Sequence, residues 1–143
     1  MHTRQTELNW DMDVILGIAG RYPRLQKLDP ITGEIVDIIS FRTRESPYGI
    51  ARTGDTLVVG TKSGSIYCFG NMGSIGPART PDSPERIPGS LPILSVCAID
   101  ECRVVVSDAC SVYYLSAPEF EKHPLRRDAD RDVVCALAAL PND

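Results

Sequence analysis

The chain has 143 residues, of which 43% are hydrophobic and 24% charged, a balance typical of a single globular domain rather than a disordered segment. Its net charge of −4 argues against a nucleic-acid-binding protein, because neutralising phosphates requires a basic surface. No apolar run is long enough to span a membrane and no signal peptide is evident, so we expect a cytoplasmic protein, with the nucleus as an alternative.

The first predicted unit is a meander of three short apolar strands, at residues 14–20, 25–28 and 34–41. The sequence between the last two, DPITG at residues 29–33, predicts a tight turn. Proline presets the φ angle of such a turn, and glycine accepts a positive φ.

The second predicted unit contains the strongest hairpin signal of the chain, with strands at residues 56–61 and 65–69 joined by a turn at residues 62–64. Runs of β-branched and aromatic residues flanked by Gly-Asp and Ser-Gly favour this structure. A short strand at residues 48–52 precedes the hairpin. The segment 70–92 is rich in Gly, Pro and Ser, so we expect a surface loop with one edge strand at residues 85–87.

The third predicted unit repeats this order, with strands at residues 93–99, 103–107 and 112–115 and an edge strand around residues 123–126. The apolar segment 133–140 (VVCALAAL) follows it. Its Ala and Leu residues would suit a short helix, but its place in the repeat favours a strand.

Equivalent positions recur about 40 to 47 residues apart, as at Ile15, Val58 and Val105. A repeat of this length with four strands per unit is typical of the blades of a β-propeller. The continuously apolar runs VIL, LVV and VVV agree with inner strands that neighbouring blades cover on both faces. The sequence therefore predicts an all-β fold of about three four-stranded antiparallel propeller blades.

The hairpin sequence SGSIYCF and its copies resemble WD40-type repeats, in which a Ser-Gly or Asp-Gly turn precedes a strand of the G-x-I-x-x-F/W kind. The Trp-Asp pair that often closes this strand is missing: the corresponding ends are Phe69-Gly70, Leu115-Ser116 and Leu28-Asp29. The resemblance therefore rests on periodicity over most of the chain. A PQQ-type propeller is the alternative, because LDPITGEIV also suits its blades.

We divide the single predicted domain into blades at residues 14–47, 48–92 and 93–132, with a closing strand at 133–140. The first blade lacks an inner strand, and the closing strand lacks the rest of a blade. Since closed propellers need at least about four blades, we expect the chain to complete a propeller with a second copy of itself or with a partner chain. The alternative is that the chain is one segment of a larger propeller, whose missing blades belong to a partner or to a longer parent chain.

The five cysteines, Cys68, Cys97, Cys102, Cys110 and Cys135, lack the paired spacing of a zinc site. Most of them lie in or beside apolar strands, so we expect free thiols that are buried or half-buried. Reduced thiols agree with a cytosolic or nuclear protein.

Four acidic residues lie at turns, where the catalytic groups of propeller enzymes gather: Asp55, Asp100, Glu101 and Asp108. Asp is common in turns because it binds its own backbone, and that is the role we expect for Asp55 and Asp100. No Ser–His–Asp set can be assembled with His2 or His123. We predict no catalytic, cofactor-binding or metal site.

The resemblance and the acidic composition favour a non-catalytic scaffold that binds proteins, with neither nucleic acid nor a membrane as partner. An enzyme or a quinone-cofactor protein on a propeller is the alternative. We predict that the interaction surface includes Arg21, Arg24, Arg52, Lys62 and Asp108.

Overall fold

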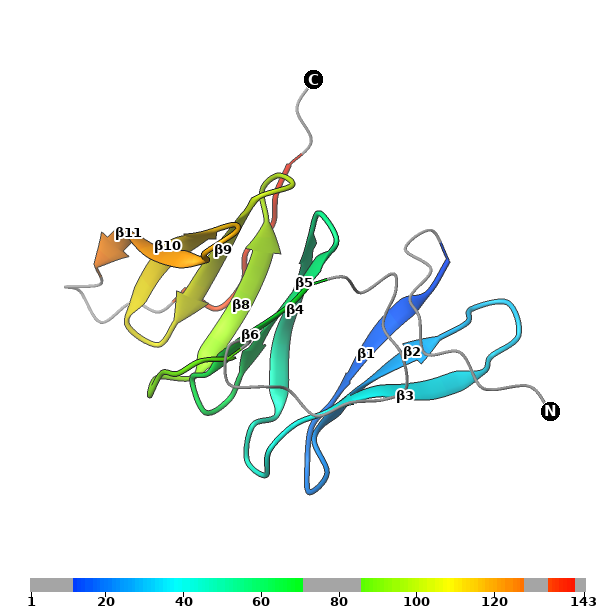
Figure 1. Ribbon diagram of the computed structural model, residues 1–143. Coiled ribbons are helices and arrows are strands. Elements are labelled where there is room, and N and C mark those ends of the chain that lie inside the picture. Colours follow the sequence, from blue (N-terminus) through cyan, green and yellow to red (C-terminus); the bar gives the residue numbers. More distant parts are fainter. Residues whose placement is uncertain (1–11, 71–85, 128–133, 141–143) are drawn as a thin grey trace.

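The computed structural model describes residues 12–70, 86–127 and 134–140, and the strands in these ranges form three antiparallel sheets (Figure 1). The sheets follow one another along the chain, and each packs face to face with the next. The described residues contain no helix, and so none that is long and apolar enough to cross a membrane. The predicted all-β class is confirmed, and we call the three sheets the first, second and third blade.

The first blade contains three strands, β1 (Val14–Ile18), β2 (Arg24–Leu28) and β3 (Ile35–Ser40), paired in that order. The turn between β2 and β3 begins at Asp29, whose carboxylate accepts hydrogen bonds from two backbone N–H groups of the turn. It ends at Gly33, which has a φ of 77°. The Asp-Pro and Gly residues therefore form the turn that they predict.

The second blade contains four strands in sequence order: β4 (Pro47–Thr53), β5 (Thr56–Thr61), β6 (Ile66–Phe69) and β7 (Arg86–Ile87). The β5–β6 turn includes Gly64 at a φ of 101°, a conformation that glycine adopts without strain. The predicted outer edge strand is present as β7, although it is only two residues long.

The third blade contains β8 (Ile93–Ala98), β9 (Arg103–Asp108), β10 (Ser111–Ser116) and β11 (Glu121–Arg127), again in sequence order. The predicted edge strand is β11, and it is longer than expected. It contains Pro124, which an edge strand tolerates because it pairs with a neighbour on one side only.

The first and second blades pack through a core that includes three aromatic rings. Phe41 and Tyr67 have ring centroids 5.1 Å apart, and Tyr67 stacks on Phe69 at 5.6 Å. Aromatic pairs at these distances stabilise a core beyond the area that they bury. The buried members of this core are Leu25, Ile38, Ile39, Phe41, Leu57, Val59, Tyr67 and Phe69.

The second and third blades pack through a separate core of aliphatic residues and one tyrosine. Its buried members are Val58, Ile66, Ile93, Val96, Val104, Val106, Tyr113 and Leu115. Strand β5 contributes to both cores, with Leu57 and Val59 on one face and Val58 on the other. The continuous apolar run of this strand is therefore explained, because neighbouring blades cover both of its faces.

The outward faces of the first and third blades have no neighbouring blade among the described residues. On the first blade, Val14, Leu28 and Ile35 lie side by side in register, and Val14 and Ile35 are 44% and 45% exposed. On the third blade, Cys97 and Val105 form the corresponding register row. The runs VIL and VVV are therefore covered on one face only.

Two glycines allow the second and third blades to approach closely. A Cβ on Gly60 would overlap the side chain of Ile93, with Ile93 Cβ only 2.8 Å away. A Cβ on Gly49 would lie 2.9 Å from Val96 Cγ2. Since Gly49 lies in β4 and Gly60 in β5, glycine is required where these strands meet β8.

A buried carboxylate fixes the connection between the first and second blades. The side chain of Glu45 accepts hydrogen bonds from Nε and Nη2 of Arg86, at 3.1 and 2.9 Å, and from the hydroxyl of Tyr67. Ser65 Oγ lies 3.5 Å from the same carboxylate. This network joins the β3–β4 connection to β6 and β7, the two outermost strands of the second blade.

The strand predicted at residues 133–140 is wrong for its described part. Residues 134–140 adopt no strand and are mostly exposed. Their backbone N–H and C=O groups have no pairing strand in the described chain, and the repeat register cannot supply one. The segment nevertheless lies beside β8 (Figure 1), where the N–H of Leu137 donates to Ser95 Oγ at 3.1 Å.

We predict that Gly60→Ala lowers the free energy of unfolding by about 1–3 kcal/mol, because the added methyl group overpacks the contact with Ile93. Chemical denaturation followed by circular dichroism measures this change. Gly70→Ala is the matched control, since a Cβ there meets no atom within 4 Å. Equal stabilities of the two variants would contradict the close contact between the blades.

We predict that Glu45→Gln lowers the free energy of unfolding by about 2–3 kcal/mol, because it leaves Arg86 without its charged partner at a partly buried site. A double-mutant cycle with Arg86→Gln should show that the two losses are not additive. Asp37→Asn is the control: its ion pair with Arg24 is exposed and should be worth less than about 1 kcal/mol. Additive losses at Glu45 and Arg86 would show that the two do not act as a pair.

Candidate functional site

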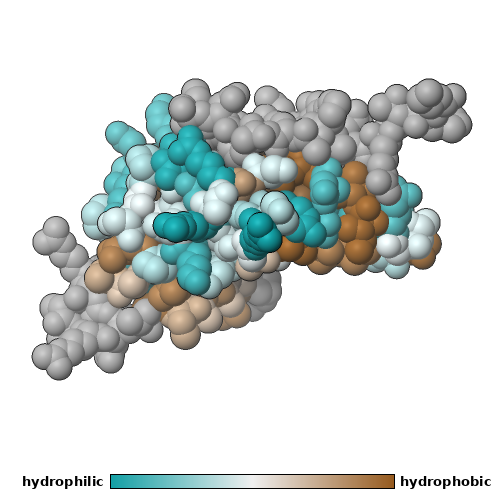
Figure 2. Space-filling model, turned by 90° about the horizontal axis from the view of Figure 1, so that it is seen from below, coloured by the Kyte–Doolittle hydropathy of each residue, from teal (hydrophilic) through white to brown (hydrophobic). Residues whose placement is uncertain are grey.

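Three of the connections between successive strands lie at the lower end of the molecule in Figure 1. They are the β1–β2 turn, the β3–β4 connection and the β5–β6 turn. Figure 2 looks onto this end and shows hydrophilic residues over its middle, with hydrophobic residues beside them. Two residues of the predicted interaction surface, Arg21 and Lys62, lie at this end.

A cleft with a volume of about 610 Å³ lies where these three turns meet. Three cationic side chains line it, one from each turn: Arg21, Arg44 and Lys62. Tyr48, which is 51% exposed, adds an aromatic ring from the start of β4. Three hydroxyl residues complete the polar lining: Thr43, Ser46 and Ser63.

Ser46 holds the three turns of the cleft together. Its backbone carbonyl accepts a hydrogen bond from the N–H of Lys62 at 2.9 Å, and its hydroxyl accepts one from the N–H of Gly20 at 3.3 Å. Ser46 is 7% exposed, so both bonds are shielded from water. The positions of the cleft residues are thus set by backbone contacts between turns that are distant in sequence.

Arg44 has a φ of 74°, which is rare for a residue other than glycine. It follows the exposed Thr43 and precedes the buried Glu45, so the chain passes from the surface to the interior at this residue. The Glu45–Arg86 network fixes the buried side of this transition. Backbone conformations of this kind persist where the surrounding structure enforces them, and they cluster at functional sites.

The structure brings two of the five predicted surface residues, Arg21 and Lys62, into this cleft. Arg24 lies in β2 and forms an ion pair with Asp37, with 3.5 Å between Nε and Oδ1. Arg52 lies near the opposite end of β4, where its Nε donates to the carbonyl of Gly54 at 2.8 Å. Neither lines the cleft.

Asp108, which we predicted to be part of the interaction surface, is a buried residue that is only 6% exposed. Its carboxylate accepts hydrogen bonds at 2.8 Å from the N–H groups of Cys110 and Ser111. A charged residue that follows the apolar run of β9 suggests an exposed strand end. Here the Asp instead closes a tight turn that packs against the second blade.

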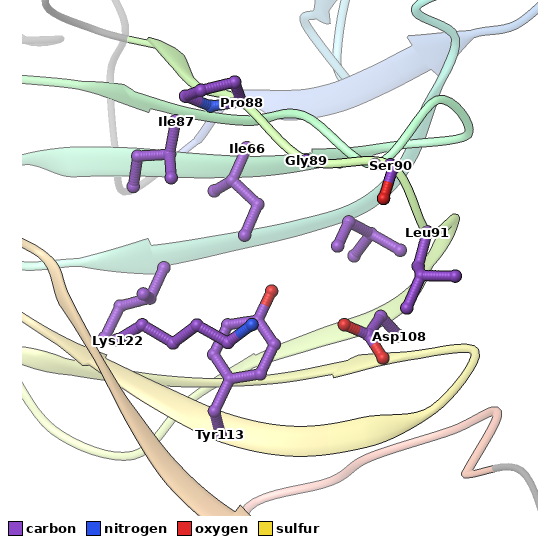
Figure 3. A pocket seen from close by; sticks show the side chains of 12 residues that line it. Ile66, Ile87, Pro88, Gly89, Ser90, Leu91, Asp108, Tyr113 and Lys122 are labelled. Carbon is purple, nitrogen blue, oxygen red and sulfur yellow. The ribbon is translucent and has the colours of Figure 1, made fainter.

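Asp108 instead lies in a cavity of about 190 Å³ between the second and third blades (Figure 3). Ile66 and Leu91 line its apolar wall, and the hydroxyl of Tyr113 points into it. The Lys122 ammonium lies 4.3 Å from the centre of the Tyr113 ring, a cation–π contact. Burial raises the pKa of Tyr113 well above its usual value, and the Asp108 carboxylate adds to this, so the phenol stays neutral.

The other acidic candidates lie at the opposite end of the strands. The carboxylate of Asp100 accepts hydrogen bonds from the N–H groups of Cys102 and Arg103, the turn role predicted for it. Asp55 lies in the β4–β5 turn, after Gly54 with a φ of 59°. Within the part of the chain that the structure describes, no group of three His, Cys, Asp or Glu side chains is placed to hold a metal ion.

His123 contacts a tyrosine rather than the acidic candidates. His2 lies outside the described residues, and the His123 ring stacks on Tyr114 with 4.5 Å between centroids. This stack is on the outward face of the third blade, away from the cavity that holds Asp108.

All five cysteines are free thiols. Cys68 and Cys97 are half-buried, as predicted. The other three are exposed, so the prediction is wrong for Cys102, Cys110 and Cys135. The first two lie in turns and the third in the segment without a strand, so no neighbouring blade covers them.

Sequence reasoning missed the joint role of Arg44, Ser46 and Glu45. The available signal was their position: all three lie in the connection between two blades, the same end of the molecule as the turns with Arg21 and Lys62. A meander places alternate turns at the same end of its strands, so the topology puts these turns at one end of the molecule.

No protein-family model matches this chain, and neither does any curated protein. Among solved structures, the fold is similar to the crystal structure of BamB from Moraxella catarrhalis, with a TM-score of 0.55 and 16% sequence identity. The match covers 86% of this chain and 36% of that chain, so this chain spans about a third of the length of BamB. BamB is a β-propeller, and the similarity confirms that the three sheets are propeller blades.

The Asp100 turn generates a prediction about pH. Its hydrogen bonds with Arg103 and Cys102 hold the pKa of the Asp100 carboxyl well below its usual value of 3.8. Because the folded-state pKa is lowered, the stabilisation is present above about pH 4 and is lost as the pH falls further. We expect Asp100→Asn to reduce the loss of stability between about pH 5 and pH 2, measured by urea unfolding. An unchanged acid profile would contradict this role.

Proposed function

We propose that this chain is a non-catalytic protein–protein interaction scaffold made of WD40-like blades, and that a second copy of the chain completes its propeller. The proposal rests on one observation: the two ends of the three-blade array lack complementary parts of one blade. The first blade has no inner strand among the described residues. The chain after the third blade continues into the apolar segment 134–140, which pairs with no strand of the described chain.

The inner edge of β1 supports this proposal. In the second and third blades, the equivalent strands β5 and β9 pair with an inner strand, β4 or β8. Among the described residues, strand β1 pairs with β2 only. An added strand would satisfy the N–H and C=O groups along its other edge.

The position of residues 134–140 also supports it. Inner strands of neighbouring blades lie side by side, as β4 and β8 do. The hydrogen bond between Leu137 and Ser95 holds the segment beside β8, where the inner strand of a following blade would lie. We propose that this segment pairs with β1 of the second copy and becomes a strand there.

The open faces of the first and third blades supply the apolar area for such an assembly. The row with Val14 and Ile35 leaves apolar side chains half-exposed, and exposed apolar patches mark interaction sites. Two copies would give six blades, which exceeds the minimum of about four for a closed propeller. The free thiols suit a reducing compartment, so we place this assembly in the cytoplasm.

Light scattering coupled to size-exclusion chromatography tests the proposal. We predict that the full chain has twice the mass of one copy, and that removing residues 134–143 leaves a monomer because β1 loses its added strand. Removing residues 141–143 alone is the control and should leave the dimer intact. A stable, compact monomer of the full chain would contradict completion by a second copy.

A further inference from the structure

We propose that the cleft between the first and second blades binds an acidic peptide segment of a partner protein, with carboxylates on Arg21, Arg44 and Lys62. This inference rests on the proposed scaffold function and names the chemistry of the partner. Three turns that are far apart in sequence each contribute one cation to this cleft. Arginine and lysine are the side chains that bind carboxylates through charge-assisted hydrogen bonds.

No described residue around the cleft neutralises its positive charge. No Asp or Glu is among its described lining residues. None of the three cations forms an ion pair within the part of the chain that the structure describes. Glu45 is next to Arg44 in sequence, but its carboxylate is buried and engaged by Arg86.

The backbone turns that carry the cations are held in place before any ligand binds. The Arg21 guanidinium lies 5.7 Å from the centre of the Tyr22 ring, a cation–π contact that limits its motion. Arg44 is fixed by the connection that carries it, and the backbone of Lys62 is bound to Ser46. Groups that are positioned in advance lose less conformational entropy when they bind, and so bind more tightly.

The size and lining of the cleft favour a peptide over a single small anion. Its volume of about 610 Å³ is in the range of sites that hold drug-sized molecules. The exposed ring of Tyr48 and the side chain of Ala19 add an apolar surface between the cations. Acidic residues interspersed with apolar ones match this mixture.

The same features argue against RNA as the occupant. Binding to a nucleic-acid backbone requires a track of cations that follows successive phosphates. Here the cations converge on one cleft, and the whole chain carries a net charge of −4. The overall charge repels a polyanion, whereas a short acidic segment meets only the local cluster.

Fluorescence anisotropy with a short fluorescein-labelled peptide of alternating Glu and Leu tests the inference, with a Gln–Leu peptide of the same length as its control. We expect only the Glu–Leu peptide to bind, and its affinity to fall as NaCl is raised. Arg21→Gln, Arg44→Gly and Lys62→Gln should each weaken binding by about 3- to 10-fold. Glycine is chosen at Arg44 because it accepts the positive φ and removes only the cation.

Arg24→Gln and Arg52→Gln are the matched controls, because they remove the same charge outside the cleft and should change the affinity less than about twofold. Equal loss in the cleft and control variants would overturn the inference, as would equal binding of the Glu–Leu and Gln–Leu peptides. Displacement of the peptide by inorganic phosphate or by a single-stranded RNA at lower concentration than by unlabelled Glu–Leu peptide would overturn it in favour of phosphate binding.

Light scattering on the same samples separates this inference from the assembly. The cleft variants leave β1 and residues 134–140 unchanged, so we expect them to keep the mass of the unaltered protein. Peptide binding by a protein that proves monomeric would support the cleft and contradict completion by a second copy. A dimer that does not bind the peptide would support completion and overturn the cleft.

Discussion

The buried carboxylate of Glu45 is the contact on which the relative placement of the first two blades depends. It lies in the connection between them, yet it binds Arg86 and Tyr67 in the outer half of the second blade. A two-residue strand such as β7 has too few backbone bonds to hold itself in place, so Arg86 gives it a second attachment. The same carboxylate turns the connection inward, and this leaves Arg44 facing out. Glu45 therefore both stabilises the fold and positions Arg44, one of the cations of the cleft.

Each blade of a meander forms nearly all of its backbone hydrogen bonds within itself, but it cannot bury its own apolar faces. Both proposals follow from this property. Every blade pairs its own strands, and its faces are covered only by its neighbours. The middle blade is satisfied on both sides, whereas the outer two present half-covered rows such as Val14 and Ile35. Turns are free of this demand, because they bury little apolar area. They can therefore carry binding groups such as Lys62 while the strands account for assembly.

The strands could be predicted from sequence because each short apolar run is bounded by Gly, Pro or Asp, and the copies reinforce one another. The same reasoning failed at residues 134–140, where the composition is right but no strand of the described residues pairs with the segment. It also failed to predict the burial of Asp108, because the sequence of a turn with an Asp is the same whether solvent or another blade covers that turn. The sequence shows the cations of the cleft, but it does not show that they come together in one place. That depends on the hydrogen bonds that Ser46 accepts, through its carbonyl and its hydroxyl, from two other turns.

The glycines at positions 49 and 60 also affect the angle between neighbouring blades. They let β4 and β5 approach β8 more closely than any side chain would allow, and so draw the blades together near the axis. The bulkier residues of the outer strands, such as Tyr67 and Tyr113, keep the blades apart farther out. Such a wedge sets the angular step from one blade to the next, and the angular step determines how many blades complete a circle. The absence of two methyl groups would thus help to decide the blade number of the propeller that we propose.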